Sequence, residues 1–360
     1  MLSYIVRRFL TSLLVIFVVL TGSFFLIRLL PGDPLQLLQQ QLNQQGGLTP
    51  AEIQAQLKVY YGVLPHGPLL TQYFQYLGNV AHGDLGRSVT DPTHSVAQII
   101  DEALPWTVFL GAASLLVAFV IGILVGTIMA VFPKGVVAQT LTVLTSFFSA
   151  IPVYVVALIL IWQVAGIHHL FPTQGAYSPD VPVGFNPAFI GSVLDHAVLP
   201  VAANVIAGFG GWALMMKGST ASTLGADYIR ASESWGLTRR RIAQTYIGRN
   251  SMLPIVTNVA LALGGLFGGA VFVETFFTYP GVAYYMVQAI GNRDYPVMMG
   301  CFILLTSATV LANFFVDLFY PLVDARIARP GGGARKAAER RREAATEAAE
   351  RVTAQRGAAS

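Results

Sequence analysis

Few residues of this 360-residue chain have the type and spacing needed for covalent chemistry. The sequence contains no G-x-x-x-x-G-K-[ST] phosphate loop, no H-E-x-x-H pair, no metal-spaced Cys and His set, and no G-x-S-x-G turn. Its single cysteine, Cys301, cannot form an intrachain disulfide. We therefore expect no catalytic residue, no bound cofactor and no metal, and we do not expect an enzyme.

The other chemically notable residues are charges inside apolar segments, namely Arg28, Glu274 and Asp317. Each such charge costs about 3 kcal/mol in a bilayer, so it usually has a use. Arg28 and Asp317 lie near the ends of their segments, where they can reach the headgroups. Glu274 has two open interpretations: it gates or contacts a solute, or it bonds to backbone amides of a re-entrant turn before Pro280. Three peripheral charges are a poor basis for a proton relay.

The elements that would position these residues are membrane-spanning helices. The mean hydropathy is +0.60, and 11% of the residues are charged, against about 25% in soluble domains. Runs of about 20 apolar residues can cross the bilayer, and the sequence predicts an all-α polytopic membrane protein with six of them. These spans cover residues 9–30, 104–132, 136–166, 189–216, 252–277 and 297–322. Pro152 is expected to kink the third span.

Lys and Arg predict the orientation of these spans. Two arginines precede the first span, one lysine lies between the second and third, six basic residues lie between the fourth and fifth, and nine lie in the tail. The alternate segments together hold three. Because basic loops stay in the cytoplasm, both termini are expected to be cytoplasmic. The apolar run of the first span is too long for a cleaved signal peptide.

We expect four regions along the chain: the N-terminus with the first span (1–30), an extracytoplasmic region (31–103), a five-helix membrane core (104–328) and a charged, partly helical tail (329–360). In the second region, Thr49 is expected to cap a helix that begins at Pro50. The aromatic residues of this part either lie at headgroup level or pack as a small cap over the spans; they are Tyr60, Tyr61, Tyr73, Phe74, Tyr76 and Trp106.

A polar, basic loop at residues 217–251 interrupts the core. Residues 227–235 suit a short helix, with Tyr228, Ile229, Ser232 and Trp235 roughly on one face. Gly236 would end this helix and Thr238 would cap a second one. The loop is interpreted either as a docking knob or as an anchor for lipid headgroups. Glycine pairs four residues apart predict close helix packing, at Gly122/Gly126, Gly264/Gly268 and Gly265/Gly269.

Four motifs, in this order and on these membrane sides, resemble the B-type permease subunits of bacterial ABC importers for dipeptides, oligopeptides and nickel. The similarity covers about residues 1–328. The motifs are Arg28-Leu29-Leu30-Pro31-Gly32-Asp33-Pro34, Gly83-Asp84-Leu85-Gly86-Arg87-Ser88, Asp227-Tyr228-Ile229-Arg230-Ala231-Ser232 with Gly236-Leu237, and Glu274-Thr275-Phe276-Phe277 with Pro280-Gly281. The chain departs from the family pattern at Glu233 and Trp235, where a basic residue is common.

This resemblance implies a type I ABC importer permease fold with a cytoplasmic coupling helix, in the bacterial inner membrane. It implies a heterodimer with a second, homologous permease, two ATPase subunits that bind ATP, and an extracytoplasmic solute-binding protein. The implied ATPase-coupling residues are Tyr228, Ile229, Arg230, Ala231, Ser232, Glu233, Trp235, Gly236 and Leu237. The implied gate or pathway residues are Glu274, Thr275, Pro280 and Gly281.

The resemblance favours peptide transport as the function of this chain. Oligosaccharides, nickel and glutathione remain alternative solutes for the same machinery. A self-sufficient secondary carrier or channel, needing no partner and no ATP, is a further alternative.

Overall fold

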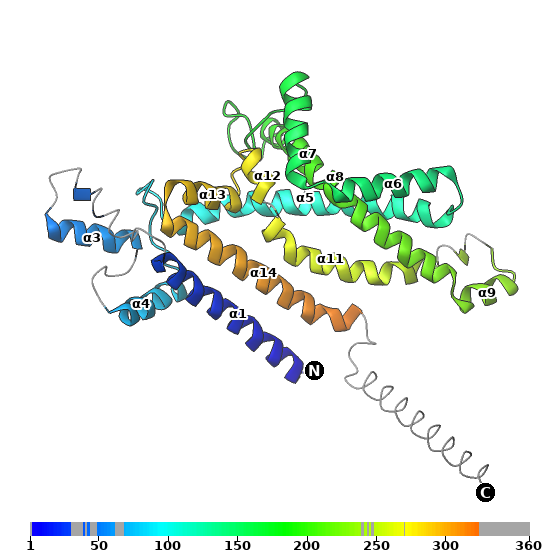
Figure 1. The fold of residues 1–360 in the computed structure, drawn as a ribbon, viewed down its shortest axis with the longest axis horizontal. Helices are drawn as coiled ribbons and strands as arrows, with labels where there is room; N and C mark the ends of the chain where they lie inside the picture. Colours follow the sequence, from blue (N-terminus) through cyan, green and yellow to red (C-terminus); the bar gives the residue numbers. More distant parts are fainter. Residues whose placement is uncertain are drawn as a thin grey trace, which may run out of the picture.

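The computed structural model describes residues 2–29, 39, 42–43, 49–61, 68–238, 241–242, 245, 248–269 and 271–323. Within these ranges the chain is helical apart from turns and one isolated bridge between Arg87 and Ser95. The all-α prediction is confirmed (Figure 1). The tail from residue 324 and most of the Gln-rich stretch at 36–45 lie outside the described residues.

Two groups of helices build the molecule. The region before the core contains α1 (Leu2–Leu29), α3 (Pro50–Tyr61) and α4 (Leu69–Ala81). The core contains α5 (Val96–Val131), α6 (Val136–Ala150), α7 (Val153–Leu160), the π-helical segment η1 (Ile161–Ile167), α8 (Pro187–Leu224), α9 (Asp227–Ser234), α11 (Arg249–Gly269), α12 (Val271–Phe276), α13 (Val282–Asn292) and α14 (Tyr295–Val323).

Long apolar helices confirm the membrane assignment. Four of them are long and apolar enough to cross a bilayer, at Ile5–Phe25, Val96–Val131, Pro187–Leu224 and Tyr295–Leu318. The bent pair Val136–Ala150 and Val153–Ile167 makes five if it counts as one span. The span expected at 252–277 corresponds to α11 and α12, on either side of residue 270. The count of six spans stays a prediction.

The third expected span is broken as well as kinked. Its two halves are bent by 96°, and the break lies at Ile151 and Pro152, whose backbones are extended with ψ of 123° and 139°. Proline lacks the N–H that a helix needs, and it disfavours the helical conformation of the residue before it. The prediction for Pro152 is confirmed, and α7 projects away from the bundle (Figure 1).

Close packing of α5 on α8 forms the centre of the bundle. A Cβ built on Gly122 would lie 2.8 Å from the Phe209 carbonyl oxygen, and one on Gly126 would meet Ala213 and Met216. Gly264 likewise faces Asn313 of α14. The predicted small-residue contacts therefore join helices of this same chain at these three glycines. A Cβ on Gly265 would meet nothing within 4 Å.

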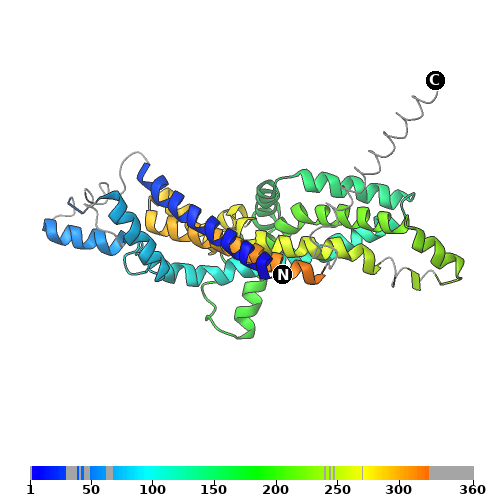
Figure 2. The same cartoon turned by 90° about the horizontal axis from the view of Figure 1, so that it is seen from below.

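The helix bundle is elongated, and different elements lie at its two ends. The region around α3, α4 and α13 lies at one end, and α9 lies at the other (Figures 1 and 2). The first residues of α1 and the last of α14 point toward the α9 end (Figure 1). Arg8 and Asp317 form a 3.0 Å ion pair between these two helices, so Asp317 serves helix association. The side chain of Arg28 lies outside the described residues.

Candidate functional site

The coupling knob, defined here as residues 225–238, projects from the end of α8. The first part of the expected loop, residues 217–224, continues α8 as helix. At the base of the knob, the Ser219 hydroxyl donates to the Ser251 carbonyl at 2.7 Å, and the Ser251 hydroxyl donates to Thr223 Oγ1 at 3.1 Å. The Lys217 ammonium donates to Thr142 of α6 at 2.9 Å. These bonds tie the end of α8, from which the knob projects, to α11 and α6.

A left-handed glycine ends the knob helix, as the sequence predicts. Gly236 has φ +72°, and the Leu237 N–H donates to the Ser232 carbonyl at 3.3 Å. This is the six-to-one bond of a Schellman ending, which needs a residue that tolerates positive φ. The Arg241 N–H donates to Thr238 Oγ1 at 3.4 Å. Most of the second helix expected after Thr238 lies outside the described residues.

The four residues expected on one face of the knob helix differ in burial. Ile229 and Ser232 are buried, whereas Tyr228 is 43% exposed and Trp235 is 75% exposed. At about 100° per residue these positions span an arc of roughly 120°, with Ile229 and Ser232 at one end of the arc and Tyr228 and Trp235 at the other, so packing covers only part of that face. Arg230 is exposed, and the side chain of Glu233 is not described. The knob therefore presents aromatic and basic groups outward.

At the opposite end, Glu274 caps α13. Its side chain is completely buried, and Oε2 accepts hydrogen bonds from the N–H groups of Ala283 at 2.9 Å and Tyr284 at 3.1 Å. The Val282 N–H donates to Thr107 Oγ1 of α5 at 2.9 Å. The first three amides of α13 are thus satisfied by side chains, where a helix has free N–H groups. Of the two interpretations of Glu274, the bond to backbone amides is present; the gating role stays a prediction.

The other residues of the E-T-x-F-x-x-P-G motif support this cap. Tyr279 donates its N–H to the Glu274 carbonyl at 2.8 Å across the turn, and the Thr275 hydroxyl bonds within its own helix. A Cβ on Gly281 would lie 2.5 Å from Glu274 Oε1. Pro280 and Gly281 therefore form the turn that brings α13 onto the carboxylate, and a side chain at position 281 would displace it.

Asp294, which the sequence analysis missed, links the outer loop to the start of α14. It is 1% exposed, and its Oδ2 accepts from the Ser88 hydroxyl at 2.5 Å and from the N–H groups of Val89 at 3.0 Å and Thr90 at 3.1 Å. The Thr90 hydroxyl also donates to it at 2.9 Å. Oδ1 accepts from the Val297 N–H at 3.3 Å. We call this set, Ser88, Val89, Thr90 and Asp294, the outer latch.

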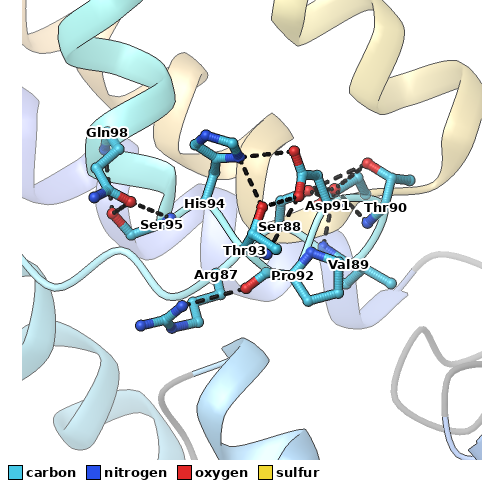
Figure 3. A network of polar contacts seen from close by, with 11 residues as sticks. Arg87, Ser88, Val89, Thr90, Asp91, Pro92, Thr93, His94, Ser95 and Gln98 are labelled. Atoms are coloured by element: carbon cyan, nitrogen blue, oxygen red, sulfur yellow. Dashed lines mark hydrogen bonds and ion pairs between the residues drawn. The ribbon is translucent and has the colours of Figure 1, made fainter.

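The latch explains why the G-D-L-G-R-S motif ends in serine. Ser88 is buried under Asp294 and also accepts a hydrogen bond from the Asp91 N–H at 2.9 Å. Figure 3 shows the tight turn that follows it, where Asp91 bonds to Thr93 and His94. An open cavity of about 190 Å³ lies beside the latch, with Glu102, Tyr285 and Gln288 among its lining residues. The one sequence signal for Asp294 was its position two residues before Pro296, which is typical of a helix start.

The aromatic residues of the outer region are divided between several contacts. Tyr73 and Tyr76 pack on Phe24 of α1, Tyr60 packs with the cluster of Leu42, Ile53 and Leu57, and Trp106 stacks on Tyr177. Phe74 is exposed, and Tyr61 has no described side chain. They do not form one common cap. The helix start at Thr49 is confirmed, because the Glu52 N–H donates to Thr49 Oγ1 at 3.3 Å and the Thr49 N–H donates to Glu52 Oε2 at 2.7 Å.

Comparison with known proteins places these features in a family. The model of the binding-protein-dependent transport system inner membrane component family matches residues 122–329, more than half of the chain. The dipeptide transport system permease protein DppB of Bacillus subtilis (strain 168) is 30% identical, over 91% of this chain and 98% of its own. The oligopeptide transport system permease protein OppB of Escherichia coli (strain K12) is 31% identical, over 91% and 99%. The crystal structure of an amino acid ABC transporter with histidines aligns at 14% identity with a TM-score of 0.44, over 62% of this chain and 92% of that one. The chain belongs to the family of binding-protein-dependent transport system inner membrane components, and it is a multi-pass transport subunit of the inner membrane.

Proposed function

We propose that this chain is one of two permease subunits of an ATP-driven importer that takes up peptides. The coupling knob is the observation that carries the proposal. It is a short helix that follows the end of α8, which is hydrogen-bonded to the start of α11, and its Tyr228 and Trp235 are exposed. A surface of this kind suits docking by another protein, because exposed aromatic groups are enriched where subunits meet. The names of the relatives, which specify dipeptides and oligopeptides, support the choice of solute.

The proposed orientation puts the knob in the cytoplasm. Support comes from the basic residues of the loop at 217–251 and of the termini. The start of α1 and the end of α14 point toward the same end as the knob, as a cytoplasmic location of both termini requires. The outer latch and the end of α13 then face the extracytoplasmic side. There a solute-binding protein would deliver the peptide.

Coupling in this proposal is mechanical. Two ATPase subunits dock on the knobs of this chain and of a second, homologous permease, and closure of the ATPases on ATP moves the knob. Because the knob follows directly on the end of α8, and the Ser219–Ser251 and Ser251–Thr223 bonds join that end to α11, its displacement would be passed to both helices. The membrane helices would then switch between inward-facing and outward-facing states.

Ion coupling has less support than ATP coupling. Three of the carboxylates in or next to the expected spans are bonded within the chain, whereas Asp195, inside the fourth expected span, is exposed. Asp317 pairs with Arg8, Glu274 caps α13, and Asp294 holds the outer latch. A carboxylate that binds and releases a transported ion would have to give up these partners.

Replacing Gly236 tests the docking role of the knob. Valine at this position would be forced into the left-handed region, at a cost of about 1–2 kcal/mol or more, and the ending of the helix would change. We expect the Gly236→Val complex to assemble and hydrolyse ATP while peptide uptake falls at least about tenfold, which corresponds to about 1.4 kcal/mol of lost coupling. Uptake into proteoliposomes and ATP hydrolysis would be measured on the same preparation.

Gly225→Ala is the matched control, because Gly225 flanks the other end of the knob helix with φ −76° and has room for a methyl group. Normal coupling in Gly236→Val would contradict the docking role. Competition of labelled dipeptide or oligopeptide uptake by oligosaccharide, nickel or glutathione would identify the solute. Flux through this chain alone, without ATP, would show a self-sufficient carrier instead.

A further inference from the structure

Helix α4 (Leu69–Ala81) rests on the outer end of α1 through one of its sides. The Tyr73 hydroxyl lies 2.7 Å from Thr21 Oγ1, and the Tyr76 hydroxyl lies 3.4 Å from Ser23 Oγ. Tyr73 also stacks on Phe25, with ring centroids 5.8 Å apart. These contacts on α1 all fall between Thr21 and Phe25. Helix α4 therefore crosses α1 at one level and does not run along it.

A second side of α4 is apolar and exposed. At about 100° per residue, Leu70, Phe74 and Leu77 share one side of the helix. Leu70 is 67% exposed and Phe74 is 66% exposed. The polar residues Thr71 and Gln75 lie on a third side, away from both the apolar side and α1. Two large apolar side chains that are exposed next to each other on a short helix indicate contact with a protein or a membrane.

The surrounding of this apolar side follows from the level at which α4 lies. The apolar span of α1 is Ile5–Phe25, so its last residues, which contact α4, mark the edge of the hydrocarbon region. Phe25 is itself exposed, and its ring connects through Tyr73 to Phe74, with centroids 5.8 and 5.5 Å apart. The apolar side of α4 is thus continuous with the exposed surface that α1 turns to lipid, which includes Leu14 and Val18.

We propose that α4 is an interfacial helix, which lies at the outer edge of the bilayer and inserts Leu70 and Phe74 among the lipid acyl chains. A helix with an apolar side, a polar side and low charge suits this position. Helix α4 contains no charged residue. The polar Thr71 and Gln75 would face water, and the tyrosine hydroxyls hold the helix on α1. This inference requires the membrane assignment and is independent of the transported solute.

Spin labelling in nanodiscs tests the position of α4. The native cysteine, Cys301, is buried and would be replaced by alanine in the tagged full-length chain, purified with the subunits that accompany it. Single labels would be placed through Leu70→Cys and Phe74→Cys, with Thr71→Cys and Gln75→Cys as matched controls on the polar side. Collision of each label with oxygen, which partitions into lipid, and with a water-soluble nickel chelate would be compared.

We expect labels at positions 70 and 74 to collide several-fold more with oxygen than with the chelate, and labels at 71 and 75 to show the reverse. Equal access of the chelate to all four labels would overturn the proposal, because α4 would then stand in water. Protection of positions 70 and 74 from both reagents would also overturn it and would identify a protein as the occupant. Either result leaves the proposed transport function untouched, since ATP-coupled uptake is measured separately.

Discussion

The two ends of the bundle satisfy their polar groups in different ways. At the outer end, the carboxylates of Glu274 and Asp294 are buried, and backbone amides of the same chain bond to them. At the α9 end, the knob helix buries Ile229 and Ser232 and leaves Tyr228 and Trp235 in the open. The comparison indicates that the outer end is held together by this chain, whereas the knob has an exposed surface, which in our proposal another chain covers. Loss of a side chain should therefore affect stability at the outer end and coupling at the knob.

Asp294→Ala is the strongest test of that difference. Removing the carboxylate leaves the buried Ser88 hydroxyl and the half-buried N–H groups of Val89 and Thr90 without their acceptor. We expect a loss of about 3 kcal/mol of stability, seen as a clear fall in the midpoint of thermal unfolding in nanodiscs. Asp91→Ala, at an exposed carboxylate in the same loop, is the control and should change the midpoint little. A midpoint unchanged in Asp294→Ala would show that the latch does not hold the outer end.

Gly281→Ala should have the next largest effect. Its new Cβ would be pressed against the Glu274 carboxylate, so the cap of α13 must shift, at a cost of about 1–3 kcal/mol. Gly291→Ala is the matched control in the same helix, because a Cβ there meets nothing within 4 Å. Alanine is favoured over glycine in a helix by about 1 kcal/mol, so this control should be neutral or stabilising. Equal midpoints for both variants would contradict the tight approach of Gly281 to Glu274.

Trp235→Ala tests the knob, where loss of a side chain should affect coupling and not stability. Because Trp235 is exposed, we expect stability to change by no more than about 0.5 kcal/mol. If the knob docks an ATPase, peptide uptake should nevertheless fall while the variant chain remains in the membrane. Ser234→Ala, at an exposed neighbouring residue, serves as the control for both measurements, stability and peptide uptake. A large loss of stability in Trp235→Ala would show that the indole packs within this chain.

The smallest effect is expected from pH at the latch turn. Hydrogen bonds from Thr93 and then His94 hold the pKa of Asp91 below its ordinary value of 3.8. The carboxylate therefore stabilises the turn above about pH 4, and this contribution is lost as the pH falls through the lower folded pKa. Hydrogen exchange of residues 88–95 in the native chain and in Asp91→Asn should differ near neutral pH and converge in acid. A difference that persists at low pH would assign the protection to another group.

Local signals were enough for the start of α3, the break at Pro152 and the end of the knob helix. Each depends on one or two neighbouring residues: Thr49 with Glu52, Pro152 with Ile151, and Gly236 with Leu237. The glycines at 122 and 126 also predicted a close contact, because a residue without a side chain lets the backbone of any neighbouring helix approach closely. Which helix they contact needed the fold.

Long-range contacts could not be read from the chain. Asp294 and Ser88 are 206 positions apart, and neither residue type predicts burial or a partner. The division of the knob residues into a buried and an exposed pair also escaped the sequence, because a helical period specifies neighbours on a surface and not which side the rest of the protein covers.

The amino-acid sequence by itself determined that this chain enters a membrane, where α3 begins, where the third span breaks, and that the chain belongs with transport subunits, since hydropathy, proline, glycine and short motifs act through covalent geometry and solvation. Only the tertiary structure decided that Glu274 caps α13, that Asp294 holds the outer loop, and that Asp317 pairs with Arg8. The physical reason is that a carboxylate takes its role from whichever donors the fold brings within about 3 Å, and those donors lie on other helices or far along the chain.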